Sequence, residues 1–113
     1  AIGANSMIGF GVELKNCVLF DRVRVGRLSF IGDSVVGENV AVGSGTMTLN
    51  QGHDFGSVRV RRNGGLVDTG MTKLGSFVGD GARLGASNTI ASGTLIAPGE
   101  MVPNHHTYPR GDS

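Results

Sequence analysis

A six-residue repeat constrains this chain more than any other feature of its sequence. An aliphatic residue followed by glycine recurs about every six residues and is clearest over residues 31–48, as in Ile31-Gly32 and Val36-Gly37. Hexapeptide repeats are a signature of parallel β-helices. A helical interpretation fails, because glycine in nearly every repeat would cost each helix about 1 kcal/mol per site relative to alanine.

The repeat predicts a solenoid of short strands. It runs over residues 2–48 and resumes over residues 74–103. Each repeat supplies one strand whose aliphatic residue points inward, while the neighbouring glycine allows a corner. Successive coils then pair edge to edge about 4.8 Å apart. The step is shorter from Leu14 to Leu19 and from Ile31 to Val36, which predicts tightened corners.

Composition limits the core and the partners. The 113 residues suffice for one domain, and 20 glycines with 5 phenylalanines, one tyrosine and no tryptophan indicate a narrow core of aliphatic columns. A net charge of +1 predicts neither nucleic acid nor an anionic membrane as partner. We find no signal peptide and no apolar run long enough for a membrane span. Cys17 is the single cysteine, which excludes an intramolecular disulfide and fits a reducing cytoplasm.

Residues 49–73 interrupt the repeat. Two alternating segments, 57–62 and 66–68, flank Asn63-Gly64-Gly65, and Asn-Gly between such segments is a strong signal for a β-hairpin. Long insertions in solenoids often lie on the binding face. An arm that embraces a neighbouring subunit is an equal alternative. The domain is therefore expected over residues 1–103 with this hairpin inserted, followed by a tail at 104–113 that caps the last coil or is disordered.

Several cations are expected on the outer surface. Lys15 follows an inward leucine, and Arg22, Arg24 and Arg27 alternate with valines that should point inward. Outward arginines are usually a solvated face, but guanidinium groups also bind phosphate in a bidentate manner. Both interpretations stay open at this point.

The stretch Leu28–Asn50 with its Gly-Ser-Gly-Thr block, followed by Leu66–Gly70 and Lys73-Leu-Gly, resembles the C-terminal acetyltransferase domain of bifunctional sugar-1-phosphate nucleotidylyltransferases. The bacterial member of that family is the N-acetylglucosamine-1-phosphate uridylyltransferase that also acetylates glucosamine 1-phosphate. The resemblance covers nearly the whole chain. It implies a left-handed parallel β-helix of about four coils, three hexads to a triangular coil, and a homotrimer.

The resemblance also implies a reaction and a set of binding residues. Acetyl-CoA, or another acyl-CoA, would lie between neighbouring subunits, near Ala86 and Asn104. The acceptor would be a sugar phosphate or sugar nucleotide, and no metal is expected. Lys15 matches a lysine that contacts the sugar phosphate or nucleotide, Asn50 an asparagine of the amino-sugar pocket, and Lys73 a lysine that reaches into the active site.

The residues expected to do the chemistry depart from the family pattern. Arg27 stands where the family has its histidine base, Phe30 where it has a tyrosine, and Ala41 where it has a second asparagine. A guanidinium stays protonated near neutral pH and cannot accept a proton. His53, three residues after Asn50, is the candidate that could replace the base.

Three functional hypotheses follow. The first is a CoA-dependent acyltransferase with altered chemistry. The second is a non-catalytic module, either a trimeric scaffold or a binder of a sugar phosphate or sugar nucleotide, in which Arg27 clamps an anion. The third is zinc-dependent carbonic anhydrase chemistry, which needs three imidazoles from two subunits. His53, His105 and His106 do not have the spacing of such ligands.

Overall fold

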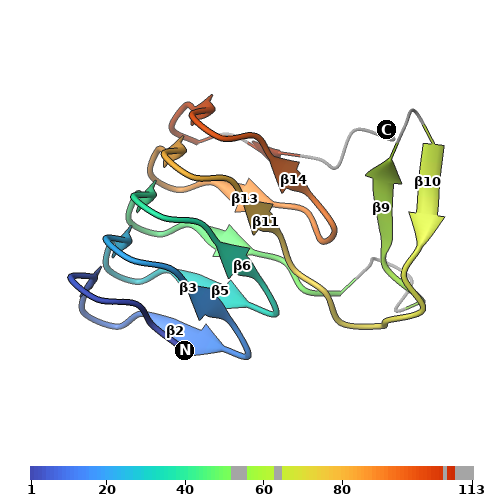
Figure 1. The fold of residues 1–113 in the computed structure, drawn as a ribbon, viewed down its shortest axis with the longest axis horizontal. Coiled ribbons are helices and arrows are strands. Elements are labelled where there is room, and N and C mark those ends of the chain that lie inside the picture. The colour runs from blue at the N-terminus through green and yellow to red at the C-terminus, as the bar shows by residue number, and fades with distance from the viewer. Residues whose placement is uncertain (52–55, 63–64, 106, 109–113) are drawn as a thin grey trace.

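The computed structural model describes residues 1–51, 56–62, 65–105 and 107–108. These residues form an all-β parallel solenoid whose successive coils contribute short strands to three sheets (Figure 1). A small antiparallel hairpin projects from the side of the coils. Among the described residues, no helix is long and apolar enough to span a membrane.

The three sheets are named here in the order in which one coil visits them. Sheet I contains β1 (Met7–Ile8), β4 (Arg24–Val25), β7 (Ala41–Val42), β12 (Arg83–Leu84) and β15 (Met101–Val102). Sheet II contains β2 (Glu13–Lys15), β5 (Phe30–Gly32), β8 (Met47–Thr48), β13 (Thr89–Ile90) and β16 (Thr107–Tyr108). Sheet III contains β3 (Val18–Leu19), β6 (Val35–Val36), β11 (Phe77–Val78) and β14 (Leu95–Ile96).

The register confirms the tightened corners. Arg24 pairs with Met7 and with Ala41, each 17 residues away, whereas Arg83 pairs with Met101, 18 residues further on. The coils of 17 residues are one residue shorter at the corner between sheets II and III. Asn16 and Asp33 turn the chain there with φ of 50° each, a left-handed conformation that asparagine and aspartate tolerate better than most side chains.

The core consists of stacked aliphatic columns, as the repeat predicts. Inward residues of successive coils lie in register, for example Leu19 on Val36 and Val36 on Val78. Small polar residues are buried two positions before many of these aliphatic residues. Their hydroxyls join neighbouring coils: Ser34 Oγ accepts a hydrogen bond from the Ser76 amide at 2.9 Å. The buried core residues are Leu19, Val23, Val25, Ile31, Val36, Val40, Val42, Val78, Ala82, Leu84, Ile90, Ile96 and Val102.

The interruption of the repeat forms the predicted hairpin. Strands β9 (Arg59–Arg62) and β10 (Gly65–Asp68) pair antiparallel, with Val60 opposite Val67. The predicted turn at Asn63-Gly64 lies outside the described residues. The hairpin leaves the solenoid at the corner between sheets II and III, and its root is held by Val58, whose amide donates to the Met71 carbonyl at 2.7 Å.

The solenoid has about five turns, one more than the four expected. Strand β16 pairs in parallel with β13, Thr107 opposite Thr89, so the stacking continues past residue 103. The predicted repeat ends at residue 103 because Pro103 and the polar residues after it carry no aliphatic-glycine pattern. Backbone pairing with the preceding coil extends the sheet without that pattern.

Candidate functional site

Three of the predicted binding residues meet at the corner between sheets II and III. Lys15 ends β2, Asn50 follows β8, and Lys73 precedes β11. A fourth residue, Asp33, links two of them: its amide donates to the Lys15 carbonyl at 2.8 Å, and its Oδ2 accepts from Asn50 Nδ2 at 2.8 Å. We call Lys15, Asp33, Asn50 and Lys73 the II–III corner cluster.

A groove of about 340 Å³ runs beside this cluster. Asp33 and Lys73 supply its charged groups. Its other lining residues are Asn16, Val18, Ser34, Val35, Met71, Leu74 and Phe77. The combination of one carboxylate, one ammonium and an apolar wall suits a small ligand that carries charges on an otherwise uncharged body.

Phe30 borders the II–III corner cluster. A Cβ built on Gly32 would lie 2.5 Å from Phe30 Cζ and 3.3 Å from Asn50 Nδ2, so the ring and the amide both lie close over this glycine. Any side chain at position 32 would displace them. Phenylalanine has no hydroxyl, so it offers the site an aromatic face and no hydrogen-bond donor.

Three other predicted residues, Arg27, Ala86 and Asn104, lie on a different edge, the corner between sheets I and II. Five residues stack there in successive coils, each two positions after the end of its strand in sheet I. They are Phe10, Arg27, Ser44, Ala86 and Asn104. Backbone hydrogen bonds join the stack, including Gly45 N to Arg27 O at 2.9 Å and His105 N to Ala86 O at 2.8 Å. We call these five residues the I–II corner column.

The two predicted cofactor residues contact one another within the I–II corner column. Asn104 Oδ1 accepts a 2.7 Å hydrogen bond from the Ala86 amide. The asparagine oxygen therefore joins two coils, which is a structural role, and leaves its amide group for other partners. Arg27 is exposed and has no side-chain partner among the described residues. Within one chain, the strands of sheet II separate this column from the II–III corner cluster.

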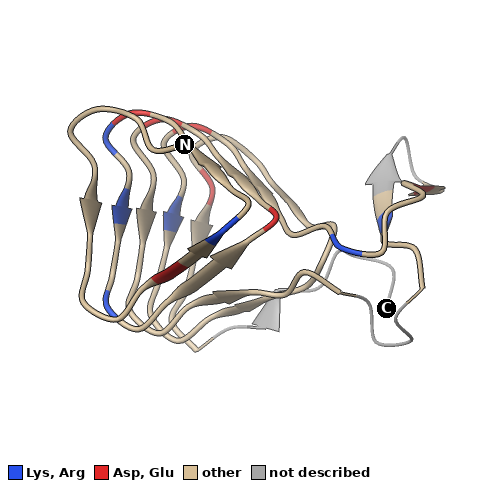
Figure 2. Cartoon of the chain, turned by 90° about the horizontal axis from the view of Figure 1, so that it is seen from below, with Lys and Arg blue, Asp and Glu red and all other residues tan. Residues whose placement is uncertain are grey.

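Figure 2 shows where the positively and negatively charged residues lie along the solenoid. Arg24 and Arg83 face outward from sheet I with Ala41 between them in register. Carboxylates gather at the corner between sheets III and I, where Asp80 Oδ1 accepts from the Glu38 amide at 2.7 Å and Glu38 pairs with Arg22. These carboxylates serve the fold, whereas the basic face is open to solvent.

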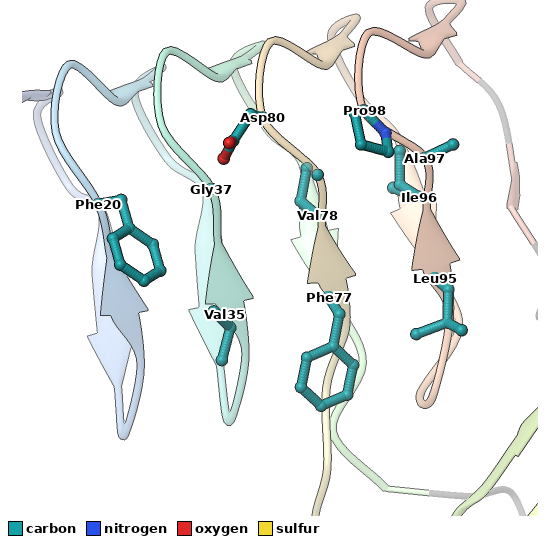
Figure 3. Close-up of a pocket in the computed structure, with 11 residues that line it drawn as sticks. Phe20, Val35, Gly37, Phe77, Val78, Asp80, Leu95, Ile96, Ala97 and Pro98 are labelled. Atoms are coloured by element: carbon teal, nitrogen blue, oxygen red, sulfur yellow. The ribbon is translucent and has the colours of Figure 1, made fainter.

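Sheet III presents an apolar outer face. Figure 3 shows Phe20, Val35, Phe77 and Leu95 on the same side of four successive coils. They line a groove of about 490 Å³, and Phe20 and Leu95 remain about half exposed, at 52% and 50%. Val35 and Phe77 also line the groove beside the II–III corner cluster, so the apolar face and that cluster are continuous.

Among the histidines, only His105 belongs to the described residues; the proposed base His53, like His106, lies outside them. No group of three or more histidine, cysteine, aspartate or glutamate residues in the described ranges could hold a metal ion. Burial raises the pKa of the Cys17 thiol, which therefore stays protonated at neutral pH and is a weak nucleophile.

Asp33 is the residue that sequence reasoning missed. It has the ordinary appearance of a turn aspartate in an Ile-Gly-Asp-Ser repeat. The available signal was its spacing: Asp33 and Asn50 are 17 residues apart, one coil length in the shortened register, so they occupy the same corner of successive coils.

The parallel three-sheet coils, the corner glycines and the hairpin insertion together define a hexapeptide-repeat, acetyltransferase-like domain. The chain belongs to the family described as the GMPPB C-terminal domain, which matches residues 1–98. A solved hexapeptide transferase family protein from Anaplasma phagocytophilum has the same fold, with a TM-score of 0.56 over 96% of this chain and 61% of that one at 17% identity.

Several relatives of this chain are described as bifunctional enzymes or as acetyltransferases. A bifunctional sugar-1-phosphate nucleotidylyltransferase/acetyltransferase of Sulfurisphaera tokodaii is 38% identical over 89 residues, which are 79% of this chain and 22% of that protein. The bifunctional protein GlmU of Trichormus variabilis is 38% identical over 103 residues, 91% of this chain and 21% of that protein. An uncharacterized acetyltransferase of Escherichia coli, YaiX, is 38% identical over 91 residues, 80% and 40% of the two chains. This chain thus spans about a fifth to two fifths of the length of these relatives.

Proposed function

We propose that this chain is an acyl-CoA-dependent transferase domain whose acceptor is an amine-bearing sugar phosphate or sugar nucleotide. The amine nitrogen attacks the thioester carbonyl carbon, the C–N bond forms, the C–S bond breaks, and CoA leaves as its thiol once the amine proton has been transferred. The observation that carries the proposal is the gathering of Lys15, Asn50 and Lys73 in the II–III corner cluster, from three segments far apart in the sequence. Relatives described as acetyltransferases support acyl-CoA as the donor.

The I–II corner column is where we propose that the acyl-CoA lies. It is a continuous strip along the coil axis in which Ser44, Ala86 and Asn104 offer small or polar side chains. Arg27 stands in the same column. A guanidinium there favours an anion, such as the oxyanion that forms at the thioester carbonyl or a phosphate of either substrate.

A base is still required, because the guanidinium of Arg27 cannot accept a proton. We propose His53 for this role, since it follows Asn50 of the II–III corner cluster by three residues. Imidazole has a pKa near the working pH of a general base.

We further propose a homotrimer in the cytoplasm, with the apolar face of sheet III between subunits. Exposed apolar faces of this kind are typical of association surfaces. Because this face continues into the groove of the II–III corner cluster, a neighbouring subunit seated on it would border that groove. Its I–II corner column could then complete the site. The single, unpaired Cys17 agrees with a cytoplasmic location.

A second candidate function is favoured by Arg27 itself. With arginine at the position of the family's base and Phe30 without a hydroxyl, the same site suits binding without turnover. The domain would then be a module that recognises a sugar phosphate or sugar nucleotide through its cations.

The test is release of CoA thiol from acetyl-CoA by the purified protein over glucosamine, glucosamine 1-phosphate and glucosamine 6-phosphate. Release that depends on the amine acceptor and exceeds thioester hydrolysis supports the transferase. Calorimetric titration with the same sugars and with CoA runs alongside. Sugar phosphate binding without release supports the binding module, and binding of neither sugar phosphate nor CoA overturns both.

A further inference from the structure

Asp33 of the II–III corner cluster is held through both its backbone and its side chain. Its backbone is fixed by two hydrogen bonds, Asp33 N to Lys15 O at 2.8 Å and Gly75 N to Asp33 O at 2.7 Å. Its carboxylate is oriented by Asn50, whose Nδ2 donates to Oδ2 at 2.8 Å. Oδ1 accepts no hydrogen bond from the described residues. Within the described part of the chain, the carboxylate is thus held through Oδ2, and Oδ1 can accept a donor from a ligand.

The groove beside Asp33 contains an opposite charge that does not neutralise it. Lys73 lines the same groove, yet within the described residues no ion pair joins its ammonium to Asp33 or to another carboxylate. Among the described residues, neither charge is therefore paired with the other. A ligand that carries one cationic and one anionic group fits this arrangement, with its cation at Asp33 and its anion at Lys73.

We propose that Asp33 binds the ammonium group of the acceptor and thereby selects amino sugar phosphates over sugar phosphates with a hydroxyl at the same position. This inference rests on the proposed function, because it assigns the acceptor of that site. Asp33 is a specificity-determining residue, and Asn50 is the positioning residue that holds its carboxylate. Lys73 contributes to binding both kinds of sugar phosphate through their shared phosphate group.

A structural role for Asp33 predicts something different. If the carboxylate only holds Asn50 and the hairpin insertion in place, its loss disturbs all ligands equally. The substitution Asp33→Asn separates the two roles. Asparagine tolerates a φ of 50° and its carbonyl oxygen still accepts from Asn50, but its side chain carries no negative charge.

The experiment is calorimetric titration of the full chain with glucosamine 1-phosphate and glucose 1-phosphate at about pH 6.5, where an amine is protonated. No CoA is added, so the result does not depend on turnover. We expect the unaltered protein to bind glucosamine 1-phosphate about tenfold more tightly than glucose 1-phosphate, as a hydrogen bond to a charged group implies. Asp33→Asn should remove this preference and leave glucose 1-phosphate binding unchanged.

Two further variants serve as controls. Lys73→Met should weaken both sugars by a similar factor. Asp21→Asn removes a carboxylate that accepts a hydrogen bond from the Ala4 amide on another corner, and should leave both affinities unchanged. The proposal is overturned if the unaltered protein shows no preference for the amino sugar, or if Asp33→Asn weakens both sugars equally or neither. The CoA release assay tests the proposed function separately. If the unaltered protein transfers the acyl group and Asp33→Asn transfers it equally well, this inference fails and the transferase function stands.

Discussion

Gly93 of the solenoid lies directly against Val58 at the root of the hairpin. A Cβ at position 93 would be 3.0 Å from Val58 Cγ1 and would overlap the carbonyl oxygen of Arg59, and the glycine has a φ of 76°. Val58 itself is 1% exposed. The hairpin is therefore packed onto the coil that follows it in the sequence, and a single glycine makes that contact possible.

Replacing this glycine should release the hairpin. Gly93→Ala combines a left-handed backbone with a clash against backbone atoms, and we expect the free energy of unfolding to fall by at least about 2 kcal/mol. Gly99→Ala is the matched control, because Gly99 has a φ of 73° and no atom within 4 Å of its added Cβ. It should cost roughly 1 kcal/mol from backbone strain alone. Urea denaturation at fixed protein concentration measures both, and equal losses would argue against the packing contact.

Thr48 occupies an aliphatic column between Ile31 and Ile90, and its hydroxyl is needed there. Thr48 Oγ1 accepts from the Gly32 amide at 3.0 Å, so Thr48→Val leaves a buried donor unpaired. We expect a loss of about 1–3 kcal/mol. Thr94 is the opposite case, because its buried Oγ1 has no hydrogen-bond partner among the described residues. Thr94→Val should be neutral or stabilising by about 1 kcal/mol. Thermal unfolding of the two variants compares them, and a shift of the same sign would contradict this assignment.

Arg27→His should place a further candidate base in the I–II corner column. If the domain binds acyl-CoA and an amine acceptor as proposed, we expect acetyl transfer to rise by at least about tenfold, since general bases contribute about 10²–10⁴ and Phe30 still lacks a hydroxyl. The gain should appear as pH rises through about 6.5, where imidazole loses its proton. Initial rates of CoA release between pH 5.5 and 8 provide the measurement. Arg27→Gln, which removes the charge without supplying a base, should show no such rise.

The apolar face of sheet III should carry subunit association. Leu95→Glu places a charge on the half-exposed last coil of this face, where it would be desolvated on contact with a second subunit. We expect dissociation to monomers in size-exclusion chromatography with light scattering. Met101→Glu is the control, because Met101 is an equally apolar residue on the outside of sheet I and is 78% exposed. A trimer that survives Leu95→Glu but not Met101→Glu would move the interface to sheet I.

The sequence predicted the coils well because their physics is local. An aliphatic residue at every sixth position and a small residue at each corner are visible without any long-range information, as Ile31-Gly32 and Val42-Gly43 illustrate. The hairpin was predicted for the same reason, since alternation around Asn-Gly is a local pattern. The last turn was missed because β16 joins sheet II through backbone pairing with β13. Backbone pairing does not require an aliphatic-glycine pattern, so the polar sequence of this segment did not indicate it.

The candidate site was predicted only in part. The resemblance proposed Lys15, Asn50 and Lys73 as residues of one site, and they share a corner in the structure. It did not indicate that Arg27, Ala86 and Asn104 lie on another corner, nor that Asp33 joins Asn50. Those relationships depend on coil length, because one residue more or less per coil changes which side chains stack.

What the sequence by itself determined is the solenoid: the six-residue periodicity places one aliphatic residue of each repeat in the core, as Val36 and Ile90 show, with small residues near the corners. What only the tertiary structure decided is the grouping of side chains on its edges. Coils of 17 residues before the hairpin and 18 after it set the register, and register across coils places Asp33 beside Asn50 and Asn104 beside Ala86. Such neighbours are one coil apart in the chain, so their contact arises from the summed geometry of three corners and from no local pattern.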